Sequence, residues 1–199
     1  MRDEREGSVG SPGNAEDRIA FRPIAGADLP DMRRWLADPD VAAWWREPDL
    51  SLDALVGKYQ PMIDGAEPVQ GFVILIDGQA LGFIQAYRIG DHPDYQRQLD
   101  VDSDAVATDL YIGDAAWRNR GWGEVVLRVF VDRIVFDEMG TDLAVIAPEP
   151  ANARAIRVYE RVGFRWVKTV SVVDDDDPAK TNEEYVMLLV REAAGTVPG

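Results

Sequence analysis

Residues 118–123, Arg118-Asn119-Arg120-Gly121-Trp122-Gly123, follow a predicted strand and open a long helix predicted over residues 118–139. The glycines let the backbone approach a ligand closely, and the amide N–H groups at a helix N-terminus favour anions. The arginines add positive charge. The segment therefore predicts a pyrophosphate-binding loop. A helix start that uses the glycines only for a tight turn is the alternative, and this segment alone does not decide between the two.

A dinucleotide-binding fingerprint, G-x-G-x-x-G, is a further alternative for the same segment. Val126 occupies the position of the third glycine, and the strands before the segment are predicted to form a hairpin rather than a βαβ unit. Asp142, about 20 residues further on, is the one feature in favour of this fingerprint. The pattern therefore disfavours a Rossmann-type site.

The elements around the loop indicate the fold class. Residues 72–76 and 81–87 flank Asp77-Gly78, a strong hairpin signal because type I′ turns need two residues that tolerate positive φ. Periodicity and capping residues predict further strands at 19–24, 105–113, 143–147, 164–173 and 184–190, and helices at 28–36, from 40, from 51, at 118–139 and at 152–162. This order predicts an α/β (α+β) domain with a mixed, mostly antiparallel sheet.

Two signatures in these elements resemble a known family. Arg118, Gly121 and Gly123 match the R/Q-x-x-G-x-G/A acyl-CoA motif of the GCN5-related N-acetyltransferases (GNAT). Residues 152–164 resemble the second signature of that family, N-x-x-A-x-x-x-Y-x-x-x-G-F. The resemblance implies the GNAT fold, a sheet of about seven strands splayed between the fourth strand and the fifth and flanked by about four to five helices. It also implies acetyl-CoA as the cofactor, with its pantetheine arm in the cleft.

A closer resemblance is to the aminoglycoside 6'-N-acetyltransferases. It is carried by residues 41–45, 59–61, 82–87, Asp109 and 152–164. It implies that Trp45 and Tyr59 border the antibiotic and that Asp109 contacts the reacting amine. Those enzymes often have an aspartate before the proline that follows the fifth strand, where this chain has Ala147-Pro148. We therefore expect the carboxylate that pairs with a substrate ammonium in those enzymes to be either lost here or supplied by another residue, for which Glu149 is the candidate.

The composition limits the mechanism. The chain has no cysteine, so an acyl-enzyme thioester is excluded and direct attack in a ternary complex is the simplest route. Asp109 is the candidate general base, and a structural hydrogen bond is its alternative role. Tyr159 is the candidate general acid by the resemblance alone, because its spacing with apolar neighbours predicts a core position. We expect the amides near Tyr111 and Ile112 to stabilise the oxyanion.

The remaining site residues follow from the same resemblance. The expected cofactor-binding residues are Tyr111, Ile112, Arg118, Asn119, Arg120, Gly121, Trp122, Gly123 and Asn152, where Asn152 also suits a helix N-cap. The expected substrate-binding residues are Trp45, Tyr59, Asp94, Asp109 and Asp174. Of Trp44 and Trp45, one is expected in the core and the other exposed. A solvated turn is the alternative for the run of aspartates that begins at Asp174.

Charge and length exclude several classes of protein. The chain has 199 residues with 21 basic and 36 acidic side chains, a formal net charge of −15. Sequence-independent nucleic-acid binding needs a basic face, so the acidity of the chain disfavours a nucleic-acid partner. No segment is apolar over the roughly 18 residues of a membrane span, so a membrane-spanning protein is excluded. The single histidine, His92, lies in a turn-rich run, and no metal site is expected. We expect residues 1–18 to be a disordered tail without a signal peptide, residues 19–191 one domain, and 192–199 a second tail, in a cytoplasmic monomer or homodimer.

The distribution of charge points to a cationic substrate. Residues 91–109 contain six aspartates and one arginine, whereas residues 153–168 contain five basic side chains and one acid. This predicts a cleft that is cationic on the coenzyme side and anionic on the acceptor side. The resemblance described above implies an aminoglycoside as this acceptor. A siderophore precursor with a lysine or hydroxylysine amine, or a polyamine, is the alternative substrate, and a non-catalytic acyl-CoA-binding domain is the alternative class.

Overall fold

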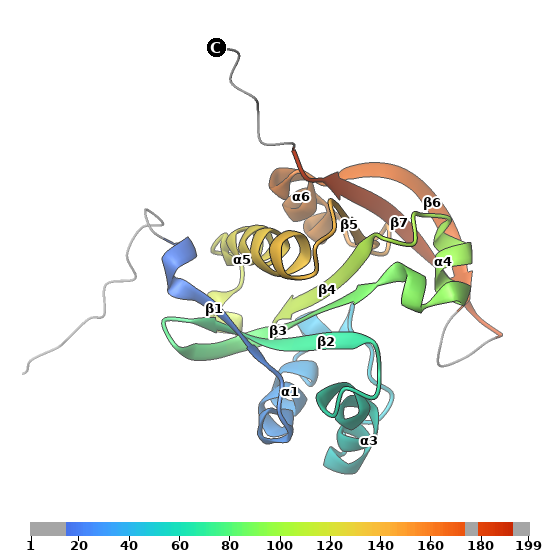
Figure 1. Ribbon diagram of the computed structural model, residues 1–199. Coiled ribbons are helices and arrows are strands. Elements are labelled where there is room, and N and C mark those ends of the chain that lie inside the picture. The colour runs from blue at the N-terminus through green and yellow to red at the C-terminus, as the bar shows by residue number, and fades with distance from the viewer. Residues whose placement is uncertain (1–14, 174–178, 193–199) are drawn as a thin grey trace, which may run out of the picture.

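The structure is a computed structural model that describes residues 15–173 and 179–192 (Figure 1). Its described residues form one seven-stranded sheet in the order β1-β2-β3-β4-β5-β7-β6. The strands are β1 (Ile19–Pro23), β2 (Val69–Ile76), β3 (Gln79–Arg88), β4 (Val106–Ile112), β5 (Leu143–Ile146), β6 (Arg165–Val173) and β7 (Thr181–Val190). Among the strands of the described residues, β4 and β5 form the one parallel pair, so the predicted mixed, mostly antiparallel sheet is confirmed.

Helices cover both faces of this sheet. They are α1 (Leu29–Leu36), α2 (Pro39–Ala42), α3 (Leu52–Ile63), α4 (Pro93–Leu99), α5 (Trp122–Phe130) and α6 (Ala153–Val162), and α5 continues as a π-helix over Val131–Glu138. Figure 1 shows α1 and α3 on one face of the sheet and α5 on the other. The predicted single helix over residues 118–139 thus begins only at Trp122. The two faces bury separate apolar clusters, one centred on Phe130 and one on Phe83.

The hairpin between β2 and β3 is confirmed at the predicted turn. Asp77 and Gly78 have φ values of 51° and 76°, as a type I′ turn requires. The short helix α4 was not predicted. Its segment is acidic and polar, but Pro93 stands at the first helical position and Asp100 ends the helix with a φ of 48°. Leu99 anchors α4 by packing into an apolar cluster with β6 and β7.

The tails fall largely outside the described residues. Residues 1–14 and 193–199 are not described, and the expectations for them stay predictions. Ala15 is buried, and Arg18 is paired with Asp77, so packed structure begins inside the segment predicted as a tail. None of the helices in the described ranges combines the length and apolar character that crossing a membrane requires.

The splay of the sheet is the feature that creates the site. Strands β4 and β5 pair through only Val106 with Ala144 and Ala107 with Val145. From Thr108 onward β4 pairs with β3 but has no described partner on the β5 side. The predicted opening between the fourth and fifth strands is therefore confirmed.

Candidate active site

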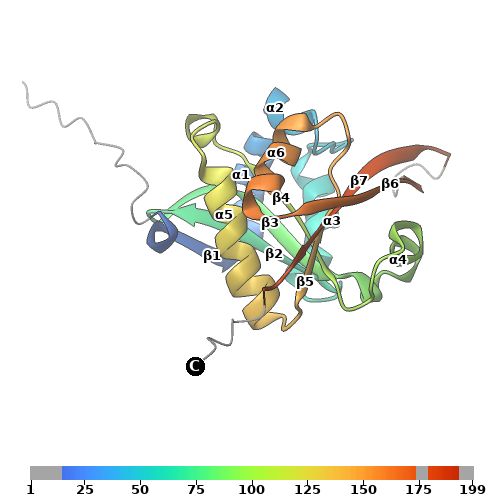
Figure 2. The same ribbon diagram turned by 90° about the horizontal axis from the view of Figure 1, so that it is seen from above.

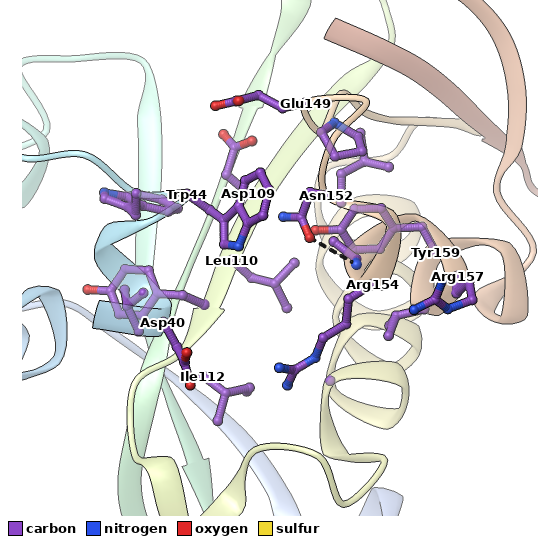
Figure 3. Close-up of a pocket in the computed structure, with 18 of the residues that line it drawn as sticks. Asp40, Trp44, Asp109, Leu110, Ile112, Glu149, Asn152, Arg154, Arg157 and Tyr159 are labelled. Carbon is purple, nitrogen blue, oxygen red and sulfur yellow. Dashed lines mark hydrogen bonds between the residues drawn. The ribbon is translucent and has the colours of Figure 1, made fainter. Parts of the chain in front are cut away.

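A cavity of about 860 Å³ lies at this opening (Figure 3). Its walls come from the segment around α2, from β3 and β4, from the loop before α5, and from the β5–α6 connection, α6 and β7. Figure 3 shows Asp109 and Glu149 at one end and Arg154 at the other. The cavity therefore has an acidic end and a basic end, as the charge distribution of the sequence predicts.

The backbone of β4 offers two amides to the cavity. Ala105 O accepts from Ile89 N at 2.9 Å, and Gly113 N donates to Leu81 O at 2.7 Å. Because ladder bonds alternate along an antiparallel pair, the odd-numbered residues of β4 face β3 and the even-numbered ones face the splay. The N–H groups of Leu110 and Ile112 thus face the cavity.

Tyr111 differs from the expectation for this strand. Its amide belongs to the β3 ladder, because Tyr111 pairs with Phe83. Its side chain is 7% exposed and packs in the apolar cluster on the α1 and α3 face. The oxyanion donors expected near Tyr111 and Ile112 are corrected to Leu110 and Ile112, and the reason is the two-residue period of the strand.

The loop before α5 fits a pyrophosphate. Gly121 has a φ of 85°, and a Cβ built at this position meets nothing within 4 Å, so the backbone borders open space. The first loop-to-helix bond runs from Glu124 N to Gly121 O at 3.2 Å, which leaves the amides of Trp122 and Gly123 without an intrahelical acceptor. Asn119, with a φ of 61°, also lines the cavity. The predicted loop therefore carries anion-binding backbone geometry.

Arginines of α6 stand beside this loop. Figure 2 shows α5 and α6 side by side, and Figure 3 shows Arg154 reaching into the cavity. Arg154 and Arg157 line the cavity and have no ion-pair partner in the described part of the chain. Sequence reasoning counted the positive charge of this helix but did not single out these two residues. Their open guanidinium groups fit a phosphate-bearing cofactor.

Three residues of the predicted loop do not present their side chains to a phosphate. Arg118 lines the cavity, but its guanidinium donates to Asp38 Oδ2 at 2.7 Å and its side chain is 9% exposed. The indole of Trp122 is buried in the core, with Arg18 stacked over its ring. Arg120 is exposed and lies outside the cavity lining. The side chains of Arg118, Arg120 and Trp122 are thus corrected as cofactor contacts, because packing and ion pairing direct them elsewhere.

Asp109 lies in the acidic end of the cavity, opposite Gln85 of β3. Its carboxylate accepts hydrogen bonds from Gln85 Nε2 at 3.1 Å and from the Tyr87 hydroxyl. Burial raises the pKa of Asp109 above its ordinary value, and these two hydrogen bonds oppose the rise. The result is a carboxylate with neutral partners and a raised proton affinity.

Tyr159 and Asn152 approach the same cavity from α6. Asn152 Oδ1 accepts from Ala155 N at 3.1 Å, so Asn152 is the N-cap of α6 as its type suggested. Tyr159 packs against Phe164, with a ring separation of 6.3 Å. Burial raises the pKa of Tyr159 well above its ordinary value, and the negative charge of Asp109 adds to the rise. Tyr159 therefore stays protonated and within electrostatic range of Asp109.

The aromatic residues of the acceptor side agree with the expectation only in part. Trp44, which is 43% exposed, lines the cavity. Trp45 lines the cavity too, as expected, and also packs edge-on against Tyr111 with a ring separation of 4.9 Å. Tyr59 is 2% exposed and does not line the cavity. The buried carboxylate of Glu47 accounts for this, because it accepts from Tyr59 Oη at 2.9 Å and from Trp45 Nε1 at 3.2 Å. Tyr59 is thus corrected to a supporting residue.

The acidic residues at the acceptor end also differ in part from the predicted substrate-binding residues. Asp94 is exposed on α4, is paired with Arg97, and lies outside the cavity lining. Asp174 lies outside the described residues. Glu149 and Glu184 line the cavity, and Glu184 accepts from Tyr95 Oη at 2.7 Å. The sequence analysis did not predict Glu184 as a cavity residue, because the pattern of its strand does not indicate toward which face of the sheet this side chain points.

The comparisons with known proteins agree with this arrangement. A family profile described as acetyltransferase (GNAT) domain matches residues 25–172. Aminoglycoside N(6')-acetyltransferase type 1 of Klebsiella pneumoniae is 26% identical over 163 residues, which are 81% of this chain and 81% of that protein. A protein of the same name from Serratia marcescens matches to the same extent.

Solved structures share the fold. That of the aminoglycoside acetyltransferase AAC(6')-Ib in complex with coenzyme A and kanamycin aligns with a TM-score of 0.74 at 25% identity, covering 87% of this chain and 95% of that one. A sheet that splays beside a glycine loop at a helix N-terminus defines a coenzyme-A-dependent acyltransferase architecture. The chain belongs to the GNAT acetyltransferase family.

Proposed function

We propose that this chain transfers an acetyl group from acetyl-CoA to a primary amine of a polycationic small molecule, in particular the 6'-amine of an aminoglycoside. The observation that carries the proposal is the position of Asp109. Its carboxylate lies in the splay of β4, in one cavity with the glycine loop and the arginines of α6. The similarity to aminoglycoside N(6')-acetyltransferase type 1 supports the substrate class. Acetylation of such a drug would confer resistance on its host.

The residues at the basic end would hold the cofactor. The amides of Trp122 and Gly123, with Arg154 and Arg157, suit its pyrophosphate. When bound, acetyl-CoA supplies an acetyl group activated as a thioester. The amides of Leu110 and Ile112 face the splay and would stabilise negative charge that develops on a carbonyl oxygen there.

The acceptor amine must lose a proton before it can attack. Asp109 would attract the ammonium group and take its proton, because its raised pKa makes it a stronger base than an ordinary aspartate. Tyr159 would donate a proton to the departing thiolate, since its raised pKa keeps the phenol protonated. With no cysteine in the chain, the simplest route is direct transfer between the two bound substrates.

A thiol-release assay tests this proposal. Acetyl-CoA is combined with the protein and, separately, with kanamycin, tobramycin, lysine, hydroxylysine and spermidine. Thiol release is expected with the aminoglycosides, and mass spectrometry with NMR of the product should locate one acetyl group on the 6'-amine. Turnover of lysine or spermidine alone would replace the aminoglycoside with the alternative acceptors. No thiol release with any amine would contradict the proposal as a whole.

A further inference from the structure

An ion pair crosses the acceptor end of the cavity. Arg46 lies between α2 and α3, and Glu149 lies in the connection from β5 to α6, 103 positions further along the chain. Arg46 Nη1 is 2.6 Å from Glu149 Oε1, and Nη2 donates to Oε2 at 3.2 Å. Both side chains line the cavity. The guanidinium therefore engages both oxygens of the carboxylate, the geometry that makes an arginine–carboxylate pair specific.

The two carboxylates at this end carry different partners. Asp109 accepts from the neutral groups of Gln85 and Tyr87, whereas Glu149 already holds a cation of the same chain. Figure 3 shows Glu149 and Asp109 at the same end of the cavity, which both residues line. An acceptor whose reacting amine reaches Asp109 therefore brings its neighbouring groups toward Glu149.

The pair is accessible to exchange. The Arg46 side chain is 59% exposed and that of Glu149 is 30% exposed, so water can replace either partner. Ion pairs with this exposure contribute little net stability and are weakened by salt. An ammonium group that enters the cavity can thus compete with the guanidinium for Glu149.

We infer that Arg46 occupies the place of a second substrate ammonium on Glu149, and that a polycationic acceptor displaces it on binding. This inference rests on the proposed function and adds a specificity-determining residue to it. Arg46 weakens the binding of acceptors with several amines, whereas an acceptor with one amine uses Asp109 alone and leaves the pair intact. Arg46 and Glu149 thus set how strongly the site prefers polycations.

Kinetics of Arg46→Gln test this inference. With saturating acetyl-CoA, the variant is expected to lower the KM for kanamycin about three- to fivefold at low salt, with kcat unchanged. The gain should shrink at high salt, because the pair is exposed. The KM for 6-amino-6-deoxyglucose, which carries one amine, should stay constant. Arg34→Gln is the matched control, since Arg34 is 67% exposed, pairs with Asp31 on α1, and lies outside the cavity lining.

Glu149→Gln supplies the reciprocal measurement. This variant should raise the KM for kanamycin, and the gain from Arg46→Gln should be smaller in its background. A KM for kanamycin that stays constant or rises in Arg46→Gln, or that falls equally in Arg34→Gln, would overturn the inference while leaving the proposed function intact.

Calorimetry separates the two proposals if wild-type protein does not acetylate kanamycin. The proposed function then fails, and binding of kanamycin to the coenzyme-A-bound protein is compared between wild type and Arg46→Gln. Tighter binding to the variant supports the inference, whereas equal binding or none overturns it. Coenzyme A affinity is expected to be the same in both proteins, because Arg46 pairs with Glu149, which Figure 3 shows at the opposite end of the cavity from Arg154.

Discussion

Arg118 donates to Asp38 at 2.7 Å and thereby joins the loop before α5 to the N-terminus of α2. Asp38 also caps α2, since its Oδ1 accepts from Asp40 N at 2.9 Å. The tryptophans of the acceptor side follow directly after α2. The family motif residue Arg118 therefore joins two walls of the cavity, and its charge is compensated within the protein.

Asp38→Asn is expected to lower the free energy of unfolding by about 1–2 kcal/mol. The substitution keeps an oxygen for the cap but removes the charge beside Arg118, whose side chain is 9% exposed. Urea denaturation measures this, with Asp31→Asn as the control because the Asp31–Arg34 pair is exposed on both sides. Equal losses in the two variants would contradict a bracing role.

The pH dependence of this brace has a definite sign. The hydrogen bond from Arg118 lowers the pKa of Asp38. A lowered carboxyl pKa contributes stability that is present above the ordinary range near about pH 4 and is lost as the pH falls through the lowered value. The difference in unfolding free energy between wild type and Asp38→Asn should therefore be constant near neutral pH and disappear in acid. A difference that persists at acidic pH would argue against the ion pair.

Asp109→Asn is expected to lower kcat about a hundredfold or more and to leave the dissociation constant of coenzyme A unchanged. The amide keeps the shape and the hydrogen bond to Tyr87 but cannot accept a proton from the acceptor. Steady-state kinetics and calorimetry with coenzyme A measure the two effects. Asp31→Asn again serves as the control for a loss of one negative charge. Unchanged turnover would remove Asp109 as the base.

Stability should respond to Asp109 in the opposite sense from activity. The raised pKa of Asp109 means that its contribution to stability is present at low pH and is lost as the pH rises through that pKa. Asp109→Asn is therefore expected to be at least as stable as wild type at neutral pH. Thermal unfolding of the two proteins between pH 4 and pH 8 checks this, and a clear loss of stability at neutral pH would contradict it.

The parts of the molecule that depend on local chemistry could be predicted from the sequence. The turn at Asp77-Gly78 and the loop at Gly121 need positive φ, and few residue types supply it. The cap at Asn152 could be predicted because few side chains can accept from a backbone N–H in the first turn of a helix. These features place the hairpin, the loop and α6, and with them the opening of the sheet.

The direction of individual side chains could not be predicted in this way. Arg118 turns toward Asp38, 80 positions away, and Glu47 draws Tyr59 into the core, because buried charges must find partners wherever the fold provides them. The side toward which each N–H group of β4 points depends on the strand register, and a register shift of one residue would reverse it. Glu149 meets Arg46 only through the tertiary structure. The glycine loop is thus determined by residues that are neighbours in the sequence, whereas the acceptor end depends on contacts between residues far apart in the sequence.

Tyr159→Phe is expected to lower kcat by about ten- to a hundredfold with little loss of stability. The phenyl ring keeps its packing against Phe164, and only the proton donor is removed. Because the pKa of Tyr159 is raised, the phenol stays protonated between pH 7 and pH 9. Its ionisation should therefore cause no loss of wild-type activity in this range, and the pH profiles of wild type and variant should have the same shape. Steady-state kinetics across this range measure both effects. A variant with wild-type kcat would assign protonation of the thiolate to solvent.

Tyr59 and Trp44 are expected to act in opposite ways. Tyr59→Phe removes a buried hydroxyl that donates to Glu47 at 2.9 Å, so it should lower the free energy of unfolding by about 1 kcal/mol and leave the KM of the acceptor nearly unchanged. Trp44→Ala removes an exposed aromatic side chain from the cavity wall, so it should raise the acceptor KM several-fold with little change in stability. Urea denaturation and acceptor kinetics on both variants separate the two roles. The reverse pattern, with the larger KM effect at Tyr59, would restore Tyr59 as a substrate contact and would require the wall between it and the cavity to open.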